Sequence, residues 1–174
     1  MLFSFVILSI AYMSCNSAEG GMSTTAKKNL EVNTAIMKAY ESGDFSKMGD
    51  YIAADAVDHG GEKGDIKGLE NIVAEMKRYK EMVKDTKMEV IKEMADEDYV
   101  FQWMKESWTQ TRESMGMKPG NYSFNMIEVS KFNAENKITE HWSFIDVNDA
   151  MKMMPQPMSG DSSSMNKMDT TARH

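Results

Sequence analysis

The 174-residue sequence contains a single cysteine, only three prolines and three histidines. One cysteine cannot form an intrachain disulfide and cannot build a cysteine-rich zinc site. Basic residues are also scarce, with 20 Lys and Arg against 27 Asp and Glu and a net charge of −7. Nucleic-acid binding normally requires a basic face, so this balance argues against it. The sequence also lacks a nucleophile elbow, a phosphate-binding loop and a zinc-protease helix motif. We therefore expect no metal site and no cofactor.

The apolar run at residues 2–13 is too short to span a bilayer as a helix, which needs about 20 residues. Its length is typical of the apolar part of a secretory signal peptide. Ser14 and Cys15 follow, and then small polar residues, which resembles a bacterial lipoprotein signal with a lipidated cysteine. We expect residues 1–14 to be a signal peptide, Cys15 to carry the anchor in the cell envelope and residues 15–25 to be a tether. The alternative is an ordinary cleaved signal, which also exports the protein.

Apolar residues make up 41% of the chain, enough for a packed core. They recur at helical spacing in three stretches, at residues 25–42, 45–54 and 69–83. The intervening glycine-rich residues 55–65 lack a period and are predicted to form a loop.

From Lys87 onward the apolar period changes to two, which predicts strands. Four strands are expected, at residues 87–94, 99–111, 122–132 and 138–147, followed by a short helical turn. Helices grouped before a strand meander predict an α+β fold with an antiparallel sheet packed on helices along one face. Residues 155–174 have no period and are predicted to be a disordered tail.

Three segments resemble the SnoaL-like polyketide-cyclase group of the NTF2-like superfamily. They are residues 53–59 (AADAVDH), 67–72 (KGLENI) and 137–146 (KITEHWSFID). The resemblance covers residues 26–154 and implies a cone-shaped α+β barrel with a pocket between the helices and the concave face of the sheet. Active members of the group act on small, largely apolar molecules, commonly without a metal or cofactor. Cyclase relatives often carry Gly-Thr-His where this chain has Glu106-Ser107-Trp108.

The last predicted strand supplies the first candidate site residues, because its side chains alternate between two faces. We expect Glu140, Trp142, Phe144 and Asp146 to face the core. Burial among apolar groups raises the pKa of a carboxyl, which suits a general acid or base. Asp146 is therefore the first catalytic candidate, and the alternative is a solvated Asp146 that caps the following turn.

His59 is the second catalytic candidate, since the resemblance places it against the pocket and histidine exchanges protons near neutral pH. The alternative is a structural histidine that holds its loop. The predicted ligand contacts are Trp142, Trp108, Tyr51, Glu140 and Phe144. The resemblance also implies a homodimer through the outer sheet face, which would place His141, Ser143 and Ile145 near an interface.

Nineteen methionines are present, and those at periodic positions suggest adaptable core packing. Methionines also cluster after residue 150, and thioethers are ligands that favour Cu(I). Three functions stay open at this stage. The first is an exported domain that binds a small apolar ligand without catalysis. The second is a cofactor-independent cyclase, isomerase or hydratase that uses Asp146 and His59. The third is a tail that binds Cu(I).

Overall fold

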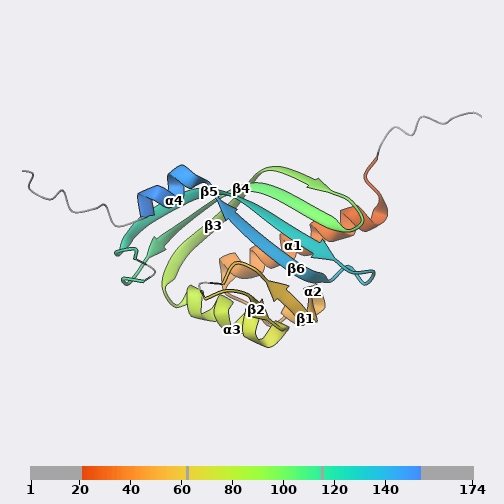
Figure 1. The fold of residues 1–174 in the computed structure, drawn as a ribbon, viewed down its shortest axis with the longest axis horizontal. Helices are drawn as coiled ribbons and strands as arrows, with labels where there is room; N and C mark the ends of the chain where they lie inside the picture. The colour runs from red at the N-terminus through yellow and green to blue at the C-terminus, as the bar shows by residue number, and fades with distance from the viewer. Residues whose placement is uncertain (1–20, 62, 115, 154–174) are drawn as a thin grey trace, which may run out of the picture.

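A computed structural model of the chain describes residues 21–61, 63–114 and 116–153, so the predicted signal, Cys15 and tail lie outside the described residues. The structure contains four helices and one six-stranded sheet within these ranges (Figure 1). In chain order the elements are α1 (Thr24–Ser42), α2 (Met48–Tyr51), β1 (Ile52–Asp58), β2 (Ile66–Lys67), α3 (Leu69–Lys80), β3 (Val83–Ala95), β4 (Tyr99–Gln110), β5 (Gly120–Phe132), β6 (Ile138–Ile145) and α4 (Val147–Met153). In the described part of the chain, every helix is too short or too polar to cross a membrane.

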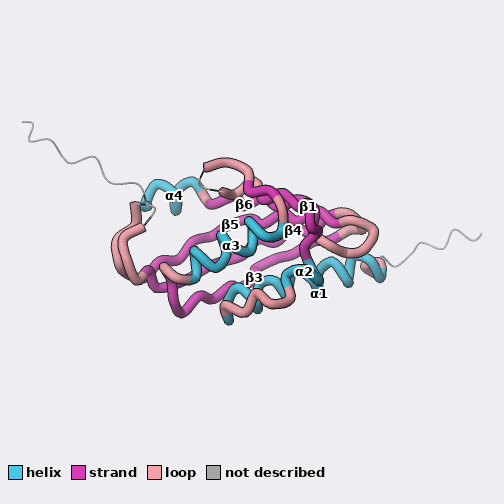
Figure 2. The backbone as a smooth tube through the Cα atoms, turned by 90° about the horizontal axis from the view of Figure 1, so that it is seen from below, coloured by secondary structure: helices cyan, strands magenta, loops and turns pink. Residues whose placement is uncertain are grey.

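The sheet is curved and has the strand order β2-β1-β6-β5-β4-β3. Only the β1–β6 pair is parallel among the described strands, and the other neighbours are antiparallel. Helices α1 and α3 lie on the same side of the sheet, with α1 against β3 and β4 and α3 against β1 (Figure 2). This arrangement confirms the predicted α+β fold of the NTF2-like type.

The first helix follows the signals in its sequence. The Ser23 side chain caps its start by accepting a hydrogen bond from the Ala26 amide at 3.1 Å. It ends where Gly43 adopts a left-handed conformation with φ of 77°, which glycine tolerates without steric cost. The helix therefore begins inside the predicted tether and stops at the predicted glycine.

Two predictions at the start of the domain are wrong. The second helix covers only Met48–Tyr51, and the residues from Ile52 to Asp58 form strand β1 instead of a helix end and a loop. The alanine-rich segment has little strand preference of its own, but β1 gains its hydrogen bonds from the distant strand β6. Helix α3 also stops at Lys80, because Val83 pairs with Gln110 in the sheet.

Strand β4 shows the clearest relation between sequence and burial. Val100, Met104 and Trp108 are buried on the concave side, while Phe101 and Trp103 are exposed on the convex side. This alternation shows which face of the strand predicted at residues 99–111 turns toward the helices. The concave residues of the sheet and the helices beneath them form separate packed clusters on either side of a cavity.

Candidate functional site

A cavity of about 610 Å³ lies between the concave face of the sheet and helices α1 and α3. Most of its wall is apolar, and methionine and isoleucine are its most frequent lining residues, with six of each among the described residues. The lining methionines are Met37, Met76, Met88, Met104, Met117 and Met126. Unbranched thioether side chains adapt to ligands of different shape, so the wall suits a small apolar molecule.

Three ionisable side chains meet on the cavity wall. The His141 imidazole lies with Nδ1 3.4 Å from Asp58 Oδ1 and with Nε2 2.5 Å from Glu128 Oε2. Ser143 donates a hydrogen bond to the other Glu128 oxygen at 2.7 Å. We call Asp58, His141 and Glu128 the histidine–carboxylate group.

The sheet register explains why these residues meet. Asp58 stands beside His141 in the parallel β1–β6 pair, and Glu128 stands opposite Ser143 in the antiparallel β5–β6 pair. Side chains alternate along each strand, so all four point to the concave face. Three strands from distant parts of the sequence therefore build the group.

Contacts within the group determine the protonation states of its side chains. Burial alone would lower the pKa of His141, but the charge of Glu128 and the hydrogen bond with Asp58 outweigh it and raise the pKa to about 10. Burial raises the pKa of Asp58, and the contacts with His141 more than reverse that effect, so the net shift is downward. At neutral pH the imidazole is therefore a cation between two carboxylates.

Glu106 is a separate carboxyl group on the cavity wall. Its side chain belongs to a residue only 7% exposed, and its Oε1 atom has no hydrogen-bond partner. Burial is the main cause that raises the pKa of Glu106 to about 7, the charge of Glu128 adds to it, and Lys80 opposes it. A carboxyl group that titrates near neutral pH is suited to exchanging a proton with a bound molecule.

Asp146 does not line the cavity, so the prediction that it faces the core is wrong. It follows the end of β6, is exposed, and accepts a hydrogen bond from the Asn148 amide at 2.9 Å. Its carbonyl oxygen also accepts from Ala150, so Asp146 caps helix α4, as in the alternative reading of its sequence.

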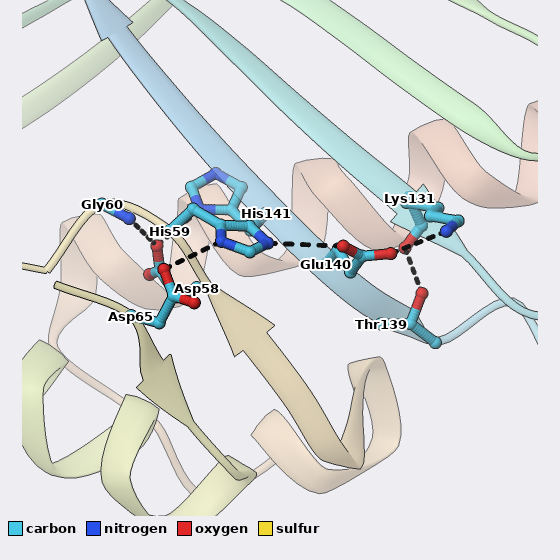
Figure 3. Close-up of polar contacts among 8 residues, drawn as sticks. All are labelled: Asp58, His59, Gly60, Asp65, Lys131, Thr139, Glu140 and His141. Carbon is cyan, nitrogen blue, oxygen red and sulfur yellow. Dashed lines mark hydrogen bonds and ion pairs between the residues drawn. The ribbon is translucent and has the colours of Figure 1, made fainter.

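His59 also lies outside the cavity wall, contrary to the sequence prediction. Its imidazole contacts Asp65 at 3.0 Å and Glu140 at 3.3 Å (Figure 3). Glu140 also accepts a hydrogen bond from the Lys131 ammonium group. The hydrogen bond with Asp65 is the main cause that raises the pKa of His59. The ring stacks on Trp142 with centroids 4.8 Å apart.

The remaining predicted ligand contacts divide between the two faces of the sheet. Trp108 lines the cavity, as predicted. Glu140, Trp142 and Phe144 belong to the convex set of β6, and Phe144 is 56% exposed. Tyr51 packs against the core below the sheet and does not line the cavity.

The two faces of β6 are therefore the reverse of the predicted ones. Alternation sorts side chains into two sets, but it does not say which set faces the helices. His141, Ser143 and Ile145 face the cavity, so the prediction that they lie near an outer-face interface is wrong. The sequence analysis also missed Glu106, although it shares its strand parity with Val100, Met104 and Trp108.

Within the described residues, no three His, Cys, Asp or Glu side chains are arranged to hold a metal ion.

Solved structures with the same fold come from several bacteria. The protein AclR of Streptomyces galilaeus is 22% identical, with a TM-score of 0.61 over 75% of this chain and 99% of that one. An LEH-like epoxide hydrolase of M. tuberculosis is 16% identical, with a TM-score of 0.61 over 75% and 87%. A SnoaL-like polyketide cyclase of Agrobacterium tumefaciens is 14% identical, with a TM-score of 0.62 over 73% and 98%. At these identities the likeness shows the fold alone.

No curated protein matches the chain. Residues 30–156, however, match the model of the family described as SnoaL-like polyketide cyclase. This match spans the three strands of the histidine–carboxylate group, the Glu106 strand and most of the residues in the helices that cover the cavity. The chain therefore belongs to the SnoaL-like polyketide cyclase family.

Proposed function

We propose that this protein binds a small, largely apolar molecule in the cavity beneath the sheet. The observation that carries the proposal is the cavity of about 610 Å³, which Trp108 lines without filling and which Trp142 does not enter. Cavities of this size that combine apolar walls with a few polar groups are typical of small-molecule sites.

The histidine–carboxylate group gives the ligand a polar anchor. His141 is bound to Asp58 and Glu128, so its ring is held in one orientation before a ligand arrives. Fixed polar groups in an apolar wall determine how a ligand lies in its site more than they determine how tightly it binds. We expect a ligand to place its polar end against these three side chains.

Proton transfer is the second candidate function, and Glu106 favours it. A buried carboxyl group with a pKa of about 7 is present both as acid and as base at neutral pH. Glu106 takes the place that the sequence analysis gave to Asp146 in a cofactor-independent cyclase, isomerase or hydratase. The family supports this class of reaction but does not choose among its members.

Export and anchoring through Cys15 stay proposals that rest on the sequence. Replacing Cys15 with Ala in a Gram-negative host tests them. We expect the natural chain in the membrane fraction with acyl chains found by mass spectrometry, and the variant without them. Identical fractionation with no acyl chains on either form would contradict lipidation.

The binding proposal is tested by titration with N-phenyl-1-naphthylamine, a neutral fluorescent probe. Ile145 lines the cavity and is 40% exposed, whereas Ile91 is 45% exposed and lies outside the cavity wall. Ile145→Trp places a large side chain at the rim and should weaken probe binding by about tenfold, on the order of the loss of one well-packed contact region. Ile91→Trp is the matched control and should bind the probe as the natural chain does. Equal binding by both variants, or no binding by the natural chain, would contradict the proposal.

A further inference from the structure

The cavity wall carries an excess of negative charge. Its ionisable acids are Asp58, Glu75, Glu106 and Glu128, and no Lys or Arg is among the described lining residues. Glu75 is paired with Arg78 on the next turn of α3. Asp58 and Glu128 share the single imidazolium of His141.

Glu106 has no such partner among the described residues. Its Oε1 atom is buried without a hydrogen bond, although the residue is 7% exposed and lines the cavity. A buried polar atom without a hydrogen bond destabilises the folded state, and more so when its group is charged. A protein that keeps such an atom facing a cavity is arranged for a partner that enters with the ligand.

Aromatic rings surround Glu106 on the cavity side. Trp108 is the next side chain on the same face of β4, and Phe124 stands directly opposite Glu106 in β5. Tyr79 lies edge-on to Trp108 with centroids 6.4 Å apart, and Tyr40 lies 5.7 Å from Tyr79. All of these residues line the cavity.

The charge of Glu106 also affects the pKa of the two tyrosines. Burial is the main cause that raises the pKa of both Tyr40 and Tyr79, and the Glu106 carboxylate raises each further. The carboxylate and the two phenol rings are therefore near enough to act on one ligand group. Aromatic faces attract cations, most strongly when water is excluded.

We propose that the ligand carries an organic ammonium group, which is held between Glu106 and the rings of Trp108, Tyr79 and Tyr40. This inference rests on the proposed binding function and names the class of its ligand. The apolar remainder of the molecule lies along the methionines, and the ammonium group satisfies the unpaired carboxylate oxygen.

The same arrangement makes binding depend on pH. The groups that act on Glu106 are Glu128 from β5, Lys80 and Tyr79 from α3, and Tyr40 from α1. A cation binds the ionised form of Glu106, whose pKa in the free protein is about 7. Affinity should therefore rise with pH by up to about tenfold per unit below pH 7 and level off above it.

The test uses two probes of the same shape, benzylammonium, whose N–H groups can donate to the Glu106 carboxylate, and its neutral carbon isostere ethylbenzene. Calorimetric titrations compare the natural chain with Glu106→Gln and with Glu89→Gln. Glu89 is exposed on β3, outside the cavity wall, so its variant makes the same charge change as a matched control. The natural chain and Glu89→Gln should prefer the cation by about tenfold or more. Glu106→Gln should lose that preference and the pH dependence, while it retains the neutral probe.

The possible failures are distinguishable. Equal affinity of the natural chain for both probes, or a preference for the neutral one, would overturn the ammonium inference and leave the binding function standing. A cation preference that survives in Glu106→Gln would overturn the role of Glu106. Binding of neither probe would contradict the proposed function itself. Melting curves of each variant show whether a loss of binding comes from loss of the fold.

Discussion

His141 and Glu128 lie on neighbouring strands with their side chains in contact, Nε2 to Oε2, at 2.5 Å on the cavity wall. The contact makes a cation of a histidine that burial alone would neutralise. It joins residues from the two central strands of the sheet, β6 and β5, and Asp58 brings β1 into the same group.

Breaking this contact should destabilise the fold in a pH-dependent way. His141→Asn leaves Asp58 and Glu128 facing each other without a cation, at an expected cost of about 2 kcal/mol near pH 6. The folded pKa of about 10 exceeds the ordinary value of 6.5, so the contribution is complete below pH 6.5 and is lost as pH rises toward 10. Thermal or urea unfolding of both chains across this range measures it.

His59→Asn is the control for this prediction. His59 also contacts two carboxylates, but on the outer side of the sheet. Solvent screens such pairs, so the loss of stability should be smaller. The carboxylates that pair with His141 are less exposed, at 22% and 17%, than those that pair with His59, at 44% and 33%. A larger loss in His59→Asn than in His141→Asn would therefore contradict the stabilising role assigned to the His141 cation.

Removing the charge of Glu106 should stabilise the protein. The folded pKa of about 7 lies above the ordinary value of 4.5, so the free energy of unfolding falls as the pH rises from 4.5 to 7. Above pH 7 this loss of stability is complete and stays constant. Glu106→Gln has no such penalty and should be more stable near pH 8 by about 3 kcal/mol, with the gain absent near pH 4. Unfolding curves at both pH values decide this, and a loss of stability near pH 8 would show that the carboxylate has a stabilising partner.

Asp146 should behave as a helix cap and not as a site residue. Asn caps helices about as well as Asp, so Asp146→Asn should change stability little. Asp146→Ala should cost about 1 kcal/mol, because it removes the acceptor for the Asn148 amide. Both variants should bind the cavity probe as the natural chain does. Loss of probe binding in folded Asp146→Asn would restore Asp146 to the site.

The convex face of the sheet supports the expectation of a homodimer, which we propose to test. The register places Trp103, Ile127 and Phe144 in one row across three strands, with Phe101, Val129 and Trp142 in the next row. Trp103 is 51% exposed, and apolar patches of this kind commonly mark interfaces.

Trp103→Glu should convert a dimer to a monomer in sedimentation experiments. Met22→Glu, at an exposed position before α1, is the control and should leave the assembly unchanged. A natural chain that sediments as a monomer at high concentration would contradict the dimer.

The sequence predicted the fold because its longest elements carry strong local signals. Aromatic and β-branched residues recur along residues 99–111, and a glycine follows the first helix. Strand β1 could not be predicted in this way, because its pairing partner β6 lies some eighty residues further along the chain.

The site was harder to predict than the fold for a related reason. Alternation in residues 138–147 separated His141 from Glu140 correctly but gave no sign of which set faced the helices. That choice depends on the position of β6 between β1 and β5. Glu106 could have been predicted as a site residue. It lies two positions before Trp108 in the same strand, so both side chains point to the concave face.

The most direct test of the account is a nuclear magnetic resonance titration of protein labelled with ¹³C at the methionine methyl groups. Met104 and Met126 line the cavity, whereas Met94 is 63% exposed and lies outside its wall. Aromatic rings shift the signals of nearby methyl groups, so N-phenyl-1-naphthylamine should move Met104 and Met126 and leave Met94 in place. Shifts at Met94 with Met104 and Met126 unmoved would place the ligand outside the cavity and contradict the proposed function.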